Sequence, residues 1–197
     1  MKKTILAIFM MISLGLSNIA NAEVISAAEF QSRIEKMADV MNKFRKGSSS
    51  YYSINAIANG TLSETKVWNY TTSGYGLTPR CEISVNQNTM ERLNVSDDTL
   101  AWVIGHELGH CELGHGKVMS LLNIPTDSWK DEYDADLVGK RLMQAAGYNF
   151  EIVRAEIPLI LNEVASTTHP DAKSRMANIT TPNNTRYYPS LIKISKN

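Results

Sequence analysis

The chain has 197 residues, of which 20 are basic and 20 acidic, and 43% of its residues are hydrophobic. This length suits one domain with a buried core. The balanced charge gives no electrostatic basis for a nucleic-acid or anionic-membrane partner, and so argues against both classes of function.

The first 22 residues have the pattern of a secretory signal peptide. Lys2 and Lys3 precede an uncharged apolar stretch, and the segment ends in the small-residue sequence Ala20-Asn21-Ala22. We expect cleavage after Ala22, which leaves a periplasmic or secreted mature protein without stable membrane insertion. An uncleaved membrane anchor is the alternative, but the apolar stretch is short for a span of about 20 residues.

The mature chain contains two cysteines, Cys81 and Cys111. An even pair in an exported protein predicts a disulfide bond. Two buried free thiols are the alternative. A metal-binding thiolate at Cys111 is a third possibility. It is disfavoured because, in a helix, position 111 would lie well off the face shared by the histidines at positions 106 and 110.

The N-terminal half of the mature chain predicts one helix and a small sheet. Ser26-Ala-Ala-Glu29 is a capping-box pattern, and the apolar spacing after it predicts an amphipathic helix over residues 27–45. This segment is either a packing helix or an inhibitory pro-segment. Alternating apolar residues predict strands near 52–58, 66–71 and 80–85, with Asn59-Gly60 as a hairpin turn. We therefore expect an antiparallel sheet.

Helical patterns dominate the rest of the chain. Ser96-Asp97-Asp98 caps a helix predicted to run from Thr99 to about Met119. Further helices are expected over 128–146, over 150–166 with a kink at Pro158, and from Pro170 to about Ile179. The resulting fold class is α+β, with a single domain of residues 23–197. Its parts are an N-terminal helix region (23–50), a sheet region (51–95), the catalytic helices (96–179) and a tail (180–197).

The chemistry is carried by His106-Glu107-Leu108-Gly109-His110, an H-E-x-x-H sequence on the 99–119 helix. Residues four apart lie about 40° apart on one helical face, so both imidazoles can reach one zinc ion. Glu107, next to them, can polarise a water bound to that ion.

A catalytic zinc takes three protein ligands, so the chain must supply one more. Glu132 and Asp136 are four apart on the following helix and share a face. We assign Glu132 to the zinc and Asp136 to a hydrogen bond from a ligand histidine, which is how metal-bound histidines are usually held. A solvated acidic helix start is the alternative for this segment and explains Asp131 and Asp134.

His115 is a tempting third ligand, but helical geometry disfavours it. It lies about 180° around the helix from His106 and about 140° from His110. Only a break of the helix at Gly114 would allow it to reach the metal.

Four motifs in order resemble the zinc peptidase family of HtpX and the CAAX prenyl endopeptidases, which are gluzincins. They are His106-Glu-Leu-Gly-His110 with His115, Glu132-Tyr-Asp-Ala-Asp136, Leu142-Met-Gln-Ala-Ala-Gly-Tyr148, and Thr168-His-Pro170 with Arg175. The resemblance implies a zincin-like fold of the minigluzincin type, with the active-site helix beside a small sheet and an all-helical C-terminal part.

The same resemblance implies roles for particular residues. Zinc is bound by His106, His110 and Glu132, Glu107 is the general base and Asp136 supports a ligand. It also implies that His169 stands near the zinc, where it stabilises the oxyanion, with Arg175 behind it. The membrane spans of the integral-membrane members are missing here, so the chain resembles the small, soluble, exported members and their prenyl-protein substrates do not carry over.

These features predict an enzyme, a zinc endopeptidase with one zinc ion per chain that hydrolyses peptide or protein substrates outside the cytoplasm. Zinc lowers the pKa of its bound water to about 7, and Glu107 takes the proton as this water attacks the peptide carbonyl. The strand at 80–85 is a candidate edge for an extended peptide. Two alternatives stay open: a zinc-stabilised chaperone or binding module without catalysis, and a zinc amidase acting on the cell wall.

Overall fold

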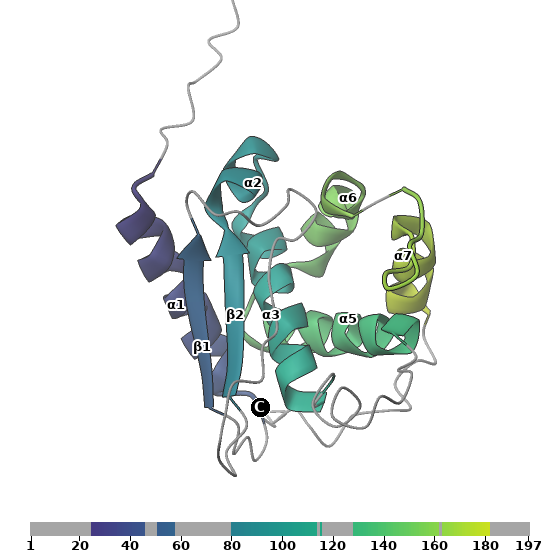
Figure 1. Ribbon diagram of the computed structural model, residues 1–197, viewed down its shortest axis with the longest axis horizontal. Helices are drawn as coiled ribbons and strands as arrows, with labels where there is room; N and C mark the ends of the chain where they lie inside the picture. The colour runs from purple at the N-terminus through teal and green to yellow at the C-terminus, as the bar shows by residue number, and fades with distance from the viewer. Residues whose placement is uncertain are drawn as a thin grey trace, which may run out of the picture.

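In the computed structural model, the described residues are 25–45, 51–57, 80–113, 115, 128–161 and 163–181. The elements within them are, in chain order, α1 (Ala27–Asn42), β1 (Tyr51–Ile57), β2 (Arg80–Asn86), α2 (Gln87–Arg92), α3 (Asp97–Leu113), α5 (Ser128–Ala145), α6 (Phe150–Ile160) and α7 (Ala172–Thr180). Helix α3 lies between the strands and α1 on one side and α5, α6 and α7 on the other (Figure 1).

Helix α1 begins as its sequence predicts. The Ser26 hydroxyl accepts a hydrogen bond from the backbone N–H of Glu29 at 3.3 Å, and the Glu29 carboxylate accepts the Ser26 N–H at 2.9 Å. This capping box satisfies two N–H groups that the first helical turn leaves without partners. The helix then buries one apolar stripe against β1 and α3, which consists of Phe30, Ile34, Met37, Ala38 and Met41.

The strands β1 and β2 pair in parallel, with Ile54 opposite Ile83. The expectation of an antiparallel sheet is therefore wrong for this pair. Side chains alternate identically in both strand directions, so the alternation could not distinguish them. A parallel pair needs a connection of about a dozen residues or more, and residues 58–79 supply it. The expected strand at 66–71 and the Asn59-Gly60 turn fall within that connection, outside the described residues.

Helix α3 is buried on every side from Thr99 to Cys111. Its predicted cap is present, because the Ser96 hydroxyl accepts the backbone N–H of Thr99 at 3.2 Å. The helix ends at Leu113 instead of continuing to about Met119. A helix that is buried all round lies inside a core, so the H-E-x-x-H sequence is part of the core formed by the described residues.

One further helix and one further helical boundary differ from expectation. The α2 helix was not predicted, although the Asn86 side chain caps it by accepting the N–H of Thr89 at 3.0 Å. Helix α6 ends at Ile160 and keeps Pro158 in its last turn, so it does not continue to residue 166. Gly147 ends α5 with a φ of 94°, as its position in the sequence indicates. None of the described helices has both the length and the apolar character of a membrane span.

Candidate metal centre

The candidate site lies where α3 and α5 approach most closely. A Cβ atom added to Gly105 would lie 3.0 Å from the carbonyl oxygen of Gly139, and one added to Gly139 would lie 2.7 Å from the backbone nitrogen of His106. Gly109 faces Ala135 in the same way, at 3.0 Å. The small residues let the two helix backbones touch, so side chains from both helices converge beside the contact.

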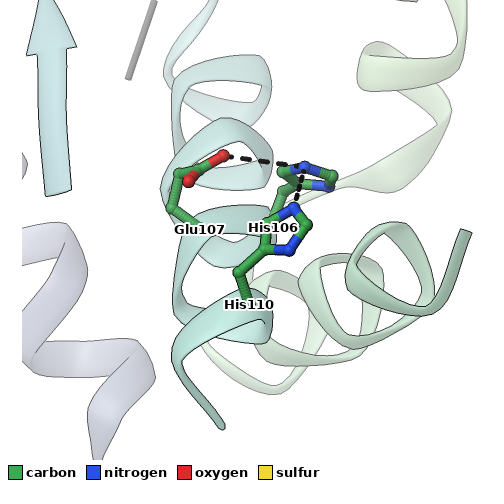
Figure 2. Close-up of side chains that lie close together, drawn as sticks. All are labelled: His106, Glu107 and His110. Carbon is green, nitrogen blue, oxygen red and sulfur yellow. Dashed lines mark hydrogen bonds and ion pairs between the residues drawn. The ribbon is translucent and has the colours of Figure 1, made fainter. Parts of the chain in front are cut away.

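His106 and His110 project from α3 toward each other, as Figure 2 shows. Their Nε2 atoms are 3.0 Å apart, and both residues are buried. Glu107 lies beside them with its Oε1 atom 3.6 Å from His106 Nε2. Ligand atoms from these three residues lie within 4.8 Å of one another, so the group has the spacing to hold a metal ion.

Glu132 reaches the same point from α5. One of its carboxylate oxygens lies 3.4 Å from His106 Nε2 and the other 3.5 Å from His110 Nε2. Its Oε2 atom is buried and has no hydrogen-bond partner among the described residues. Ligand atoms on one tetrahedral zinc, at bond lengths of about 2.0–2.2 Å, are about 3.4 Å apart. The two histidines and Glu132 therefore fit a zinc ion in both donor type and spacing.

Asp136 and Arg175 lie behind this group. The Asp136 Oδ1 atom is 2.8 Å from His106 Nδ1, the ring nitrogen that does not face His110. Arg175, from α7, donates to both oxygens of Asp136, at 2.9 Å and 2.5 Å, and its Nη1 lies 3.3 Å from Glu132 Oε2. The buried guanidinium thus links the carboxylate that backs His106 to the carboxylate that faces the metal position. The hydrogen-bonding and ion-pair partners of Arg175 are His106 on α3 and Asp136 and Glu132 on α5, so Arg175 lies behind the two α5 carboxylates.

His169 lies on the open side of the site. Its Nε2 is 3.6 Å from Glu132 Oε1, and its side chain is 52% exposed. The Ser166 hydroxyl accepts the backbone N–H groups of Thr168 and His169, at 3.2 Å and 2.9 Å, and the Thr168 hydroxyl lies 2.8 Å from His169 Nδ1. The turn over residues 166–169 was not predicted from the sequence. It holds the His169 imidazole facing the metal position and leaves it accessible to solvent.

His115 is in a turn just after the end of α3. Its backbone N–H donates to the His110 carbonyl at 3.1 Å, and its Nδ1 is 2.9 Å from His110 Nδ1. Its Nε2 lies 3.5 Å from Asp131 Oδ1. The early end of the helix thus brings His115 back to His110, but onto the ring nitrogen that faces away from His106. Asp131, expected to be a solvated helix-start residue, is its neighbour on α5. The same expectation is wrong for Asp134, which is buried.

The pKa values of this cluster are shifted in opposing directions. Burial lowers the pKa of His106, but hydrogen bonds with Asp136 and Glu132 outweigh it and raise the pKa to about 9. Burial raises the pKa of Glu107 to about 8 and lowers that of His110. Burial also raises the pKa of both α5 carboxylates, but their cationic and hydrogen-bonding neighbours outweigh this and keep them ionised.

These shifts balance the charge of the metal-free cluster near pH 7. His106 carries a proton and a positive charge, Glu107 carries a proton and no charge, and Arg175 offsets one of the two ionised α5 carboxylates. A divalent cation that replaced the two protons would leave the net charge unchanged, because His106 would become neutral and Glu107 ionised. The donor chemistry therefore suits a dication.

The two cysteines lie on neighbouring elements. Cys111 is buried in α3, which packs against β2, and β2 carries Cys81. The side chain of Cys81 falls outside the described residues, so the disulfide stays a prediction.

The model of peptidase family M48 matches residues 24–127, which are 104 of the 197 residues. The chain belongs to peptidase family M48. No curated protein and no solved structure matches it. The M48 match includes α1, both strands and the H-E-x-x-H helix, and it ends before α5. In this M48 chain, the assignment of Glu132, Asp136, His169 and Arg175 therefore rests on the contacts described above.

Several residues that shape the site were not predicted from the sequence. They are the glycines at the α3–α5 contact, the Ser166 and Thr168 hydroxyls, and the contact of His115 with His110. The glycines had a visible signal, because Gly105 and Gly109 are spaced by four residues, as are Ala135 and Gly139. The signal for the His115 contact was weaker: it depends on α3 ending before His115, which Gly114 allows but does not require.

Proposed function

We propose that this M48 chain is a zinc-dependent endopeptidase that hydrolyses peptide bonds outside the cytoplasm. The observation that carries the proposal is the position of Glu107. Its carboxylate is buried next to the two histidines, and its Oε1 has no hydrogen-bond partner among the described residues. A buried carboxyl oxygen without a partner is costly, and His106, His110 and Glu132 already supply the three protein ligands that a catalytic zinc takes. Glu107 is therefore left for the role of general base.

His106, His110 and Glu132 would hold the zinc, one ion per chain. A zinc ion there supplies a Lewis acid that makes water nucleophilic near neutral pH and polarises a carbonyl group. Glu107 takes the proton from the attacking water and delivers it to the leaving amine. Asp136 keeps the His106 ring in place by accepting a hydrogen bond from its Nδ1–H, and Arg175 holds Asp136 by donating to both of its carboxylate oxygens.

The open side of the site would receive the substrate. His169 stands there with its Nε2 facing the site, where an N–H can stabilise the developing oxyanion. The β2 strand lies beside α3, and its side away from β1 is where an extended peptide would add as a strand (Figure 1). A peptide bound in this way would present its backbone carbonyl to the metal position.

Export is the second part of the proposal. It is supported by the signal-peptide pattern of residues 1–22, which lie outside the described residues. A disulfide between Cys81 and Cys111 would then fasten β2 to the active-site helix. N-terminal sequencing of the protein recovered from a periplasmic or culture fraction should begin at Glu23, and an intact N-terminus would count against export by cleavage.

The test of catalysis is Glu107→Gln, with Glu151→Gln as the matched control. Glu151 is an exposed residue of α6, so the same chemical change there should affect neither metal content nor turnover. We expect about one zinc per chain in the unmodified protein and in both variants. Cleavage of casein-derived peptides should be lost only in Glu107→Gln. A Glu107→Gln protein that cleaves normally would contradict the assignment. Metal content without turnover by the unmodified chain would favour a binding module, and peptidoglycan cleavage in place of casein cleavage would favour an amidase.

A further inference from the structure

We propose that His115 and Asp131 are positioning residues that fix the proton of His110 on Nδ1 and so present its Nε2 lone pair to the metal. The inference rests on the proposed function, since it concerns how one zinc ligand of that site is prepared. It assigns a role to two residues outside the ligand set.

The backbone at the end of α3 turns back toward His110. The helix ends at Leu113, and the His115 N–H donates to the His110 carbonyl at 3.1 Å. This bond spans five residues where a continuing helix would span four, so it turns the chain back on itself. The turn brings the two Nδ1 atoms to 2.9 Å, which is a hydrogen-bonding distance. Both rings are largely removed from water, with side-chain exposures of 11% for His110 and 13% for His115.

The number of protons on the two contacting rings decides the tautomer of His110. Two ring nitrogens 2.9 Å apart can share only one hydrogen, so one donates and the other accepts. His110 Nε2 faces His106 Nε2 and Glu132, and it must keep its lone pair free to bind a metal. The His110 proton is therefore on Nδ1 and is donated to His115 Nδ1. The remaining ring proton of His115 is then on Nε2, which faces Asp131 Oδ1 at 3.5 Å.

The two ligand histidines differ in the group that accepts their Nδ1 proton. His106 donates to Asp136, an ionised carboxylate that Arg175 neutralises. His110 donates to an imidazole, which adds no negative charge to the cluster. With a dication bound, its two charges and that of Arg175 already balance three buried carboxylates, which are Glu107, Glu132 and Asp136. A second carboxylate placed directly behind His110 would lack a cationic partner, so a neutral acceptor with a carboxylate beyond it that is 25% exposed fits the charge balance.

The test is zinc affinity, measured by chelator competition on the full mature chain. His115→Phe removes the acceptor but keeps an aromatic ring, and we expect a loss of about 10- to 100-fold, the usual cost of removing the partner of a ligand histidine. His115→Asn places an amide oxygen near the position of Nδ1 and should recover most of the affinity. Asp131→Asn should lower the affinity less than His115→Phe. Asp134→Asn, on the same helix but paired with Lys130, is the control and should bind zinc normally.

A second measurement on the unmodified, metal-free protein does not depend on any variant folding. Imidazole nitrogen shifts in protein labelled with ¹⁵N at histidine should show the His110 proton on Nδ1, and a proton on Nε2 would overturn the proposal. Unchanged zinc affinity in His115→Phe would overturn it, and so would His115→Asn binding as weakly as His115→Phe, because the role would then be packing. Absence of zinc binding by the unmodified chain would count against the proposed function instead.

Discussion

Replacing Gly139 with alanine tests whether the close approach of α3 and α5 sets the geometry of the zinc site. The new Cβ would lie 2.7 Å from the backbone nitrogen and 3.0 Å from the Cα of His106. Both contacts are with backbone, so no flexible side chain can move aside. Ordinary contacts begin at 3.4 Å, and α5 must therefore move by about 0.7 Å at this point.

The expected magnitudes follow from that displacement. Overpacking of this kind costs about 1–3 kcal/mol, and alanine in a helix interior returns up to about 1 kcal/mol relative to glycine. We expect a net loss of about 1–2 kcal/mol in the free energy of unfolding of the metal-free protein. The movement also carries Glu132 away from His106 and His110, and metal–ligand distances tolerate only about 0.2 Å. Zinc affinity should fall at least about tenfold.

The assay is chemical denaturation with and without chelator, together with zinc competition. Gly147→Ala is the control, because Gly147 has a φ of 94° and no atom within 4 Å of the added Cβ. It should lose about 1–2 kcal/mol of stability through backbone strain alone and bind zinc normally. A Gly139→Ala protein with normal zinc affinity would refute the reasoning, whatever its stability.

Three further outcomes are expected. Zinc binding near pH 7 should release about two protons, from His106 and Glu107, and calorimetry in buffers of different ionisation enthalpy would count them; release of none would contradict the charge balance. The pKa of His106 is raised from 6.5 to about 9 and that of Glu107 from 4.5 to about 8, so the metal-free protein should lose stability as the pH rises from 6 through 9, by about 3 kcal/mol from His106 alone. Denaturation with chelator that gives the same stability at pH 6 and pH 9 would contradict both shifts. Arg175→Met should destabilise the metal-free protein by about 3–5 kcal/mol, because Glu132 and Asp136 lose their buried cation, and saturating zinc should recover part of the loss; a variant of normal stability would remove Arg175 from its assigned place.

The sequence was sufficient to predict which residues share one face of a single helix. Periodicity places His106 and His110 on one face of α3, and the structure brings their Nε2 atoms to 3.0 Å. The same reasoning pairs Glu132 with Asp136 on α5. Strand direction was missed because alternation is the same in both directions. The end of α3 was missed although Gly114 follows Leu113, because a glycine permits a helix to end without requiring it.

The contact between α3 and α5 shows where sequence reasoning could go further. Gly105 and Gly109 form a small-residue stripe on α3, and Ala135 and Gly139 form another on α5. Two such stripes allow helix backbones to touch, and here each glycine lies against the opposite stripe. Pairing the stripes fixes the rotation of both helices. Gly109 lies one residue before His110, and Ala135 lies one residue before Asp136, so His110 and the carboxylate that holds His106 flank the same contact. The geometry of the metal centre is therefore encoded in residues that contribute no ligand atom to it.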